Sequence, residues 1–594
     1  MFNIIKNKLN KSVTGGAIII AAFSVLSKIF GLVRDRLLAT SFGAGDVLDA
    51  YYVAFRLPDL IFNTLIFGAL SAAFIPVFIA IKQKNMPGVK TREHTNTRTR
   101  QYGNIKNMEN GGIAIESKDD VINHWQLSSS VMNIIFAALV FFTVIFFIFA
   151  SQLVRLIAPG FAGEKLLLTI SMTRIMLLSI LFFGISNVIS GILQATKNFS
   201  MFALAPVMYN VGIIFGIVFL VGKIGAIGLA YGVVLGAFLH LAVQIPTVVR
   251  AGFRWRPILR LKNKAVRKIG RLMLPRTLGL AVGQINQLVI TIIASTLAAG
   301  SIAVFNLAAN LASVPISIFA ISFAVASFPV FSESFVEKDE EKFVVQFSVT
   351  VRRILFFIIP ISVFIIALRA QTVRLILGAG AFDWQDTVLT ADALGYFCIS
   401  LFAQSLVPLL ARAFYARNDT LTPVIVSVIS LLANIAGSIL LVRVLGVRGL
   451  ALSFSISSII NMVVLAVILK HKFGWLDEKK IALSILKIMT AAIGGVIFLQ
   501  ITKYLIAPLV DMGTFVGVMT QFLAAGIMGV LVYFIVSFLI DSEEIKKLWR
   551  YLRSVISNQQ CGNNNCTQMI INFYILFFCV IINYIVINGF CLCF

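Results

Sequence analysis

Apolar stretches of about 20 residues follow one another along most of the chain, and no other feature constrains its fold as strongly. Each stretch is long enough for a helix to cross a hydrocarbon core about 30 Å thick, and none shows the alternation of a membrane β-barrel strand. Hydrophobic residues make up 59% of the 594 positions, a composition that excludes a soluble globular protein. The sequence therefore predicts an all-α polytopic membrane protein.

We predict 14 membrane-spanning helices from these stretches. Their ranges are 13–40, 49–82, 127–157, 166–195, 200–222, 225–248, 270–298, 302–332, 343–369, 388–416, 421–443, 447–470, 481–508 and 514–540. Residues 84–126 are polar and rich in Asn, Thr, Lys and Arg, which is typical of a flexible loop. Residues 558–594 form a tail of atypical composition, and its apolar part is long enough for one more helix.

Basic residues are concentrated in the connections that follow even-numbered helices. The densest clusters are residues 82–118, 250–271 and 470–487, and cytoplasmic loops of membrane proteins carry an excess of Lys and Arg. We therefore expect the N-terminus and the loop 84–126 to be cytoplasmic. The net charge of +25 has the same explanation, and since no nucleic-acid-binding motif accompanies it, no nucleic acid partner is expected.

The sequence lacks the motifs of enzymes and of ATP-driven pumps. Its four histidines do not have the spacing of metal ligands, and it contains neither a GxxxxGKS/T P-loop nor a GxSxG nucleophile elbow. We therefore predict a transporter rather than an enzyme, with no metal and no cofactor. For His240, in "GAFLHLAVQIP", we favour a hydrogen-bonded packing role over a proton relay.

Two parts of the chain resemble each other at an offset of six helices. "LAPVMYNVGIIFGIVFL" at 204–220 is similar to "LTPVIVSVISLLANIAGSILL" at 421–441, and "GAIGLAYG" and "GVRGLALS" open the helix that follows each. Proline and glycine inside the spans are also typical of transporters that bend around a central cavity. The predicted domains are an N-lobe of six helices at 1–250, a C-lobe of six helices at 251–472, two appended helices at 473–557 and the tail at 558–594.

Residues 27–62 carry more charge than expected between two apolar stretches. The charged residues include Lys28, Arg34, Asp35, Arg36, Asp49, Arg56 and Asp59. Because an ionisable group in lipid is costly, these side chains indicate a polar cavity for a charged ligand. The alternative is that Arg34, Asp35 and Arg36 lie at the outer end of the first helix and extend to the headgroups. Arg36 is expected to face headgroups in either case, since it lies about 200° around a helix from Arg34.

Five motifs match a known family in their order and spacing. They are "SKIFGLVRDRLLATSFGAGDVLDAYYVAFRLPDL" at 27–60, "APGF" at 158–161, "ALAPVMYN" at 203–210, "ARAFYARNDTLTPV" at 411–424 and "GVRGLALS" at 446–453. In these motifs the chain resembles the MurJ (MviN) lipid II flippases, which share a superfamily with MATE drug exporters. The resemblance implies two lobes in a V around a cationic cavity, and a groove for a polyprenyl chain beside the last two helices. It also implies transfer of lipid II, an undecaprenyl-pyrophosphate-linked disaccharide peptide, to the outer leaflet of the bacterial cytoplasmic membrane for peptidoglycan synthesis.

The resemblance assigns the charges of the first two helices to the cavity. Arg34 matches an arginine that lines the cavity of the family, and Asp49 matches an acidic residue at the start of the second helix. Lys28 lies where the family usually has another arginine. Asp35 is expected to pair with Arg34 or Arg56. The expected substrate-binding residues are Lys28, Arg34, Asp35, Asp49 and Arg56.

Two positions depart from the family pattern. Phe62 and Asn310 stand where the family often has arginine, and the C-lobe side of the cavity has thereby lost a cation. Arg276 is the nearest replacement in the sequence, although a role as an anchor at the cytoplasmic end of its helix fits it better. Some members bind a cation between the seventh and eleventh helices. Asp419 could contribute to such a site, but we favour an N-cap role for this residue.

Alternative functions follow from the same features. A MATE-like exporter, or a flippase for another polyprenyl-linked glycan, would share the predicted lobes, and a membrane scaffold that binds a lipid-linked precursor would not need the cavity charges. In the main interpretation, transport is coupled to the membrane potential or to a monovalent cation. The expected partners are lipid II, membrane lipids and the cell-wall synthesis machinery.

Overall fold

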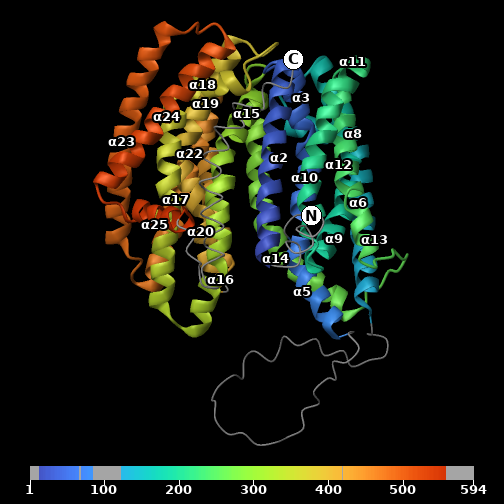
Figure 1. Cartoon of the computed structure of the whole chain (residues 1–594). Helices are drawn as coiled ribbons and strands as arrows, with labels where there is room; N and C mark the ends of the chain where they lie inside the picture. Colours follow the sequence, from blue (N-terminus) through green and yellow to red (C-terminus); the bar gives the residue numbers. More distant parts are fainter. Residues whose placement is uncertain (1–12, 66–68, 85–121, 418, 557–594) are drawn as a thin grey trace, which may run out of the picture. The chain divides into compact units, whose positions relative to one another are not determined.

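The computed structural model describes residues 13–65, 69–84, 122–417 and 419–556 (Figure 1). All regular secondary structure in these residues is helical, which confirms the predicted all-α class. Most of the loop at 84–126 and the whole tail at 558–594 fall outside the described residues, so both interpretations stay predictions.

The helices up to residue 295 are α2 (Val13–Phe42), α3 (Asp46–Ala54), α4 (Arg56–Leu65), α5 (Ala69–Lys84), α6 (His124–Ile148), α7 (Ala150–Ile157), α8 (Gly163–Leu177), α9 (Ser179–Ala195), α10 (Phe199–Phe215), η3 (Gly216–Leu220), α11 (Val221–Ile224), η4 (Gly225–Ile227), α12 (Gly228–Ala242), α13 (Ile245–Arg250) and α14 (Lys264–Ser295). The later helices are α15 (Ser301–Pro315), η5 (Ile316–Ala320), α16 (Ile321–Glu337), α17 (Glu340–Ala367), α18 (Arg369–Ile376), α19 (Trp384–Ile399), α20 (Leu401–Ala416), α21 (Leu421–Leu445), α22 (Val447–Phe473), α23 (Glu478–Ile506), η6 (Ala507–Leu509), α24 (Phe515–Leu539) and α25 (Glu543–Ile556).

Nine helical segments among the described residues are long and apolar enough to cross a membrane, and the number is ten if the bent pair α19 and α20 counts as one span. The bend between α19 and α20 is 46°. Each of the predicted ranges overlaps helical structure, but several are interrupted, as at Phe55 between α3 and α4. The structure therefore supports a polytopic helical protein, while the exact count of 14 spans stays a prediction.

The first of two compact units comprises Met1–Phe30, Ala54–Val154 and Leu167–Gln284. A cluster of buried apolar residues in this unit includes Phe74 and Phe78 of α5, which are fully buried. Helices α10 and α12 of this unit approach so closely that a Cβ atom on Gly212 would lie 2.3 Å from the Cα of Gly236. Small residues allow such close backbone packing between membrane helices.

The second unit comprises Gly31–Val53, Arg155–Leu166 and Ile285–Phe594. Helices α21 and α22 form a hairpin like that of α10 and α12, and Gly449 provides the close approach, since a Cβ atom there would lie 2.5 Å from the Leu441 carbonyl oxygen. The two similar sequence stretches thus form similar structures. The predicted domain ranges, which follow helix order, stay predictions.

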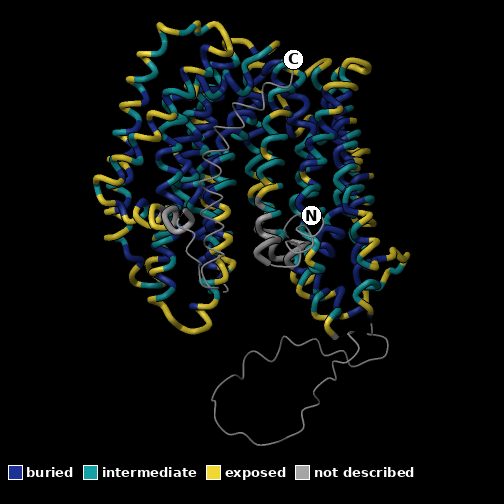
Figure 2. Tube along the Cα trace, viewed as in Figure 1, coloured by how far each residue is buried: buried dark blue, intermediate teal, exposed yellow. Residues whose placement is uncertain are grey.

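Helices α23 and α24 pack on each other and on α17 in the second unit. In an apolar stretch of 18 residues in each helix, only 28% of the residues are buried for α23 and 22% for α24. Exposed residues lie beside buried ones along the helices of this unit (Figure 2). An apolar helix that buries so little of its surface in protein is suited to contact lipid.

Candidate functional site

The first group of candidate residues is the Arg34 cluster, formed by Arg34, Asp35 and Asn310 within the second unit. The Arg34 Nε and Nη2 groups donate hydrogen bonds to Asp35 Oδ1 at 2.9 and 2.7 Å. Asn310 Nδ2 of α15 donates to Asp35 Oδ2 at 3.0 Å. Asp35 is 3% exposed, whereas the Arg34 side chain is 21% exposed. The carboxylate is thus buried between its partners, and part of the Arg34 side chain is accessible.

The Arg34 cluster is suited to exchange its own carboxylate for an anionic ligand. A guanidinium presents planar donors that match the oxygens of a phosphate, and its bonds to ionised oxygens are among the strongest hydrogen bonds in proteins. Asp35 neutralises Arg34 inside an apolar helix, where an unpaired charge would be costly. Of the two partners predicted for Asp35, the structure shows Arg34.

Asp49 of α3 is buried, and its hydrogen-bond partners do not belong to the Arg34 cluster. Its Oδ2 atom accepts hydrogen bonds from Lys165 Nζ of α8 at 2.7 Å and from the Gly300 amide at 2.8 Å, and Oδ1 accepts one from the Ala303 amide at 2.9 Å. The first amides of a helix have no partner within it and favour a negative charge nearby. Asp49, which is 1% exposed, therefore caps the start of α15 and links it to α3 and α8.

Backbone contacts reinforce this junction. The amide of Ala381 donates to the Thr40 carbonyl oxygen at 2.9 Å, and the amide of Ala44 donates to Asp386 Oδ2 at 2.8 Å. Gly300 has a φ of +85°, and a Cβ atom there would lie 1.7 Å from the Ala44 carbonyl oxygen. Only glycine fits at this position, because both the backbone angle and the space exclude a side chain.

The prediction that Arg36 faces lipid headgroups is wrong. Its Nη1 atom donates to the carbonyl oxygens of Leu375 at 2.5 Å and Ile376 at 3.3 Å, and its guanidinium lies 5.7 Å from the centre of the Phe515 ring. The last carbonyls of a helix have no partner within it. Arg36 satisfies two carbonyls at the end of α18, and the helical geometry of α2 alone could not show that another helix ends there.

The remaining predicted site residues, Lys28 and Arg56, belong to the first unit. Lys28 is exposed on α2, and Arg56 is half-buried at the first residue of α4. The structure therefore brings Arg34 and Asp35 together, gives Asp49 its own partners, and places Lys28 and Arg56 in another unit.

The positions that depart from the family pattern have local partners. Phe62 packs against Phe183, with ring centres 5.0 Å apart. Asn310, at a usual arginine position, binds the Asp35 carboxylate. The side chain of Arg276, the suggested replacement, lies outside the described residues.

Asp419 acts as the cap that we favoured over a cation ligand. It accepts hydrogen bonds from the Thr422 amide at 3.0 Å and the Thr422 hydroxyl at 2.7 Å, and it forms an ion pair with Lys472. Burial alone would raise the pKa of Asp419, but the hydrogen bonds from Lys472 and Thr422 outweigh it, so this pKa lies below its ordinary value.

His240 has the packing role predicted for it. Its Nδ1 atom lies 2.7 Å from Ser186 Oγ, and Gln244 Nε2 donates to the same hydroxyl at 2.7 Å. Gln244 Oε1 accepts a hydrogen bond from Ser190 at 2.8 Å. These side chains join α9 to α12, and His240 is one member of the network.

Lys165 is the functional candidate that sequence analysis missed. It lies just after the "APGF" motif and forms ion pairs with both Asp46 and Asp49 at 2.7 Å. A lysine at the start of an apolar helix is ordinary in a membrane protein, so only the folded structure identifies its partners.

Comparison with known proteins tests the resemblance. A sequence model described as lipid II flippase MurJ matches residues 38–519, which is most of the chain. The chain belongs to the MurJ family.

Similar MurJ proteins come from distant bacteria. The lipid II flippase MurJ of Burkholderia cenocepacia is 27% identical over 471 residues, which cover 77% of this chain and 85% of the relative. The probable lipid II flippase MurJ of Thermotoga maritima is 28% identical over 533 residues, or 89% of this chain and 98% of the relative.

Solved structures show the same fold. A lipid II flippase MurJ in an inward closed conformation matches with a TM-score of 0.70 and 24% identity, covering 88% of this chain and 98% of that structure. An inward-facing MATE family multidrug transporter matches with a TM-score of 0.59 and 16% identity, covering 76% of this chain and 96% of that structure. The chain thus has the fold that MurJ shares with MATE transporters.

Proposed function

We propose that this protein moves lipid II from the inner to the outer leaflet of the bacterial cytoplasmic membrane by alternating access. The observation that carries the proposal is the match to the lipid II flippase MurJ family over residues 38–519. The Arg34 cluster supports it, because a pyrophosphate headgroup needs counter-charges in a low-dielectric environment. No catalytic step is part of this proposal.

In the proposed cycle, Arg34 exchanges one anionic partner for another. Asp35 holds the guanidinium when no substrate is bound, and a phosphate oxygen of lipid II takes the place of the carboxylate. Asn310 then keeps a hydrogen bond to Asp35, which limits the cost of burying that carboxylate alone. Lys28 and Arg56 are proposed to contribute further positive charge to the cavity.

The two helices that follow the C-lobe are proposed to receive the lipid chain. α23 and α24 bury little of their apolar surface in protein, and such a surface is suited to an undecaprenyl chain. A MATE-like exporter, or a flippase for another polyprenyl-linked glycan, is the second candidate. Asn310 and Phe62 favour it, since both stand where the family often has arginine, whereas the larger share of this chain covered by the MurJ structure favours lipid II.

Three further features belong to the proposal. The N-terminus is cytoplasmic, transport is coupled to the membrane potential or to a monovalent cation, and the protein works beside the cell-wall synthesis machinery. The basic loop at 250–271 supports this orientation through the positive-inside rule.

A replacement experiment tests the function. The resident lipid II flippase of a test bacterium is depleted while this chain is expressed, and lipid II accessible from outside the cell is labelled. We expect labelling to be restored. If this chain reaches the membrane at normal levels and labelling is not restored, another headgroup is the substrate.

A further inference from the structure

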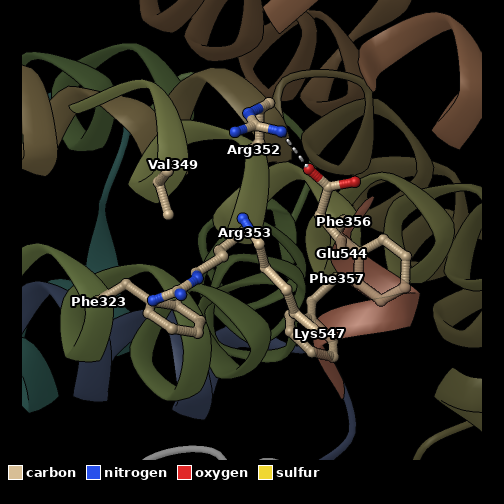
Figure 3. Close-up of a pocket in the computed structure, with 8 residues that line it drawn as sticks. All are labelled: Phe323, Val349, Arg352, Arg353, Phe356, Phe357, Glu544 and Lys547. Carbon is tan, nitrogen blue, oxygen red and sulfur yellow. Dashed lines mark hydrogen bonds and ion pairs between the residues drawn. The ribbon is translucent and has the colours of Figure 1, made fainter. Parts of the chain in front are cut away.

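A recess between α16, α17 and α25 lies apart from the residues discussed so far. It encloses about 500 Å³, including its open mouth, and is lined by Phe323, Val349, Arg352, Arg353, Phe356, Phe357, Glu544 and Lys547 (Figure 3). All of these residues belong to the second unit. Its lining combines an apolar wall with three cations and one carboxylate.

Arg352 forms the buried end of the recess. Its side chain is 7% exposed, and its Nη1 atom donates to Glu543 Oε2 at 2.9 Å and Glu544 Oε1 at 3.0 Å. Its Nε atom is buried and has no hydrogen-bond partner among the described residues. A buried donor without a partner is costly, and because this atom is shut off from solvent, contact with a ligand in the recess falls to Arg353 and Lys547.

Arg353 adds a second guanidinium to the recess. It is half-buried, and within the described residues it forms neither a hydrogen bond nor an ion pair. Lys547 of α25 also lines the recess, and its nearest carboxylate is Glu543, 3.8 Å away. Glu544, the one carboxylate of the lining, already binds Arg352, and Lys547 pairs with Glu543, so Arg353 is the cation of the lining that has no ion pair among the described residues.

The surroundings of the recess are those of a membrane surface. α25, with the sequence EEIKKLWRYLRSVI, has Ile545 buried and Lys546, Trp549 and Arg550 exposed. It follows the largely apolar 25-residue helix α24 after residues 540–542. An amphipathic helix with Lys, Arg and Trp next to a membrane span is typical of the interface between headgroups and acyl chains.

We propose that this recess binds the phosphate group of an anionic glycerophospholipid from the adjacent leaflet. The phosphate accepts hydrogen bonds from Arg353 and is balanced by Lys547, while Phe357, which is partly exposed, contacts the first part of the acyl chains. Arg353 supplies a bidentate donor that suits phosphate oxygens. The ligand fixes α25 against α17 and is not the transported substrate, so the site does not depend on the proposed function.

The test measures lipid binding to the full chain by native mass spectrometry, with dioleoyl phosphatidylglycerol as the probe. Arg353→Gln removes the guanidinium without breaking a hydrogen bond or an ion pair among the described residues. We expect Arg353→Gln to weaken binding of the first phosphatidylglycerol by about tenfold or more, and Arg353→Lys to weaken it less. Dioleoyl phosphatidylcholine is expected to bind at least about tenfold more weakly than phosphatidylglycerol, because its headgroup has no net charge.

Arg550→Gln is the matched control. Arg550 is exposed on α25 and does not line the recess. Its replacement by glutamine changes the net charge by the same amount as Arg353→Gln. Equal binding by the Arg353→Gln and Arg550→Gln proteins would overturn the proposal and indicate general attraction to the basic surface. Full displacement of the lipid by an equal concentration of inorganic phosphate would overturn the lipid assignment and leave a simple phosphate site. Thermal unfolding of the lipid-free variants confirms that each is folded.

Discussion

Arg34 and Asp35 are neighbours in the sequence, yet the role of their ion pair depends on Asn310, 275 residues away. In this arrangement the carboxylate of Asp35 is buried and the side chain of Arg34 is partly accessible. This asymmetry is what a reversible anion site requires, because the protein supplies the resting partner and the ligand replaces it.

Replacing Arg34 tests the proposed substrate contact. We expect Arg34→Ala to abolish flipping while insertion stays normal, since a hydrogen bond between charged groups contributes about 1.5–3 kcal/mol and no other guanidinium belongs to the cluster. Flipping is measured in cells with protein levels held equal, and Arg155→Ala, an exposed arginine of α7, is the control. An active Arg34→Ala protein would refute the cavity assignment.

We expect Arg36 to contribute to the stability of the fold, which an arginine that only faces lipid headgroups would not do. Arg36→Gln should lower the thermal unfolding temperature in detergent, because two carbonyls at the end of α18 lose a charged donor worth about 1.5–3 kcal/mol. Arg36→Lys should recover part of the loss. Unchanged unfolding of the glutamine variant would show that these contacts do not stabilise the fold.

Asp49 and Lys165 form a pair whose coupling can be measured. We expect Asp49→Ala to be strongly destabilising, because it leaves the Gly300 and Ala303 amides without this acceptor and takes from Lys165 one of its two carboxylate partners, Asp46 being the other. A double-mutant cycle with Lys165→Met should give a coupling of about 0.5–3 kcal/mol in thermal unfolding. Additive effects of the two substitutions would contradict the direct contact.

At the scale of elements, pairs of helices are held together by close backbone contacts at glycine. α10 contacts α12 at Gly212 and Gly236, and α21 contacts α22 at Gly449. The two similar sequence stretches therefore both pack closely at glycine. Membrane helices gain little from burying apolar surface against lipid, and close packing of small residues therefore matters more than it does in water.

Gly212→Val tests whether close packing at glycine holds α10 and α12 together. The new side chain would meet the backbone of Gly236, which cannot rotate away, so α10 and α12 must separate. We expect a clear loss of folded protein after detergent extraction, measured by size-exclusion chromatography. Gly222→Ala is the control, since a Cβ atom at Gly222 would meet nothing within 4 Å. Equal yields from the two variants would argue against close packing here.

At the scale of the whole molecule, the orientation in the membrane follows from the distribution of basic residues. In a version with the six native cysteines replaced by serine, a cysteine at Arg260 should be labelled only from the cytoplasm and one at Ala298 only from outside. Ala298 is chosen because it is exposed, whereas Gly300 on the same connection leaves no room for a side chain. Labelling of residue 260 from outside would overturn the predicted order of the spans.

The sequence by itself determined the helical class, the apolar helical stretches, the pair of similar hairpins and the family, because these depend on local hydrophobicity and on motifs contiguous in the chain. Only the tertiary structure decided the partners of the charges. Asp49 meets Lys165 across 116 positions, Arg36 meets the end of α18 across 339, and Asn310 meets Asp35 across 275. A charged residue in the sequence shows that a partner is needed, since an unpaired charge is costly in an apolar environment, but the periodicity of its own helix carries no information about which distant backbone or side chain provides that partner.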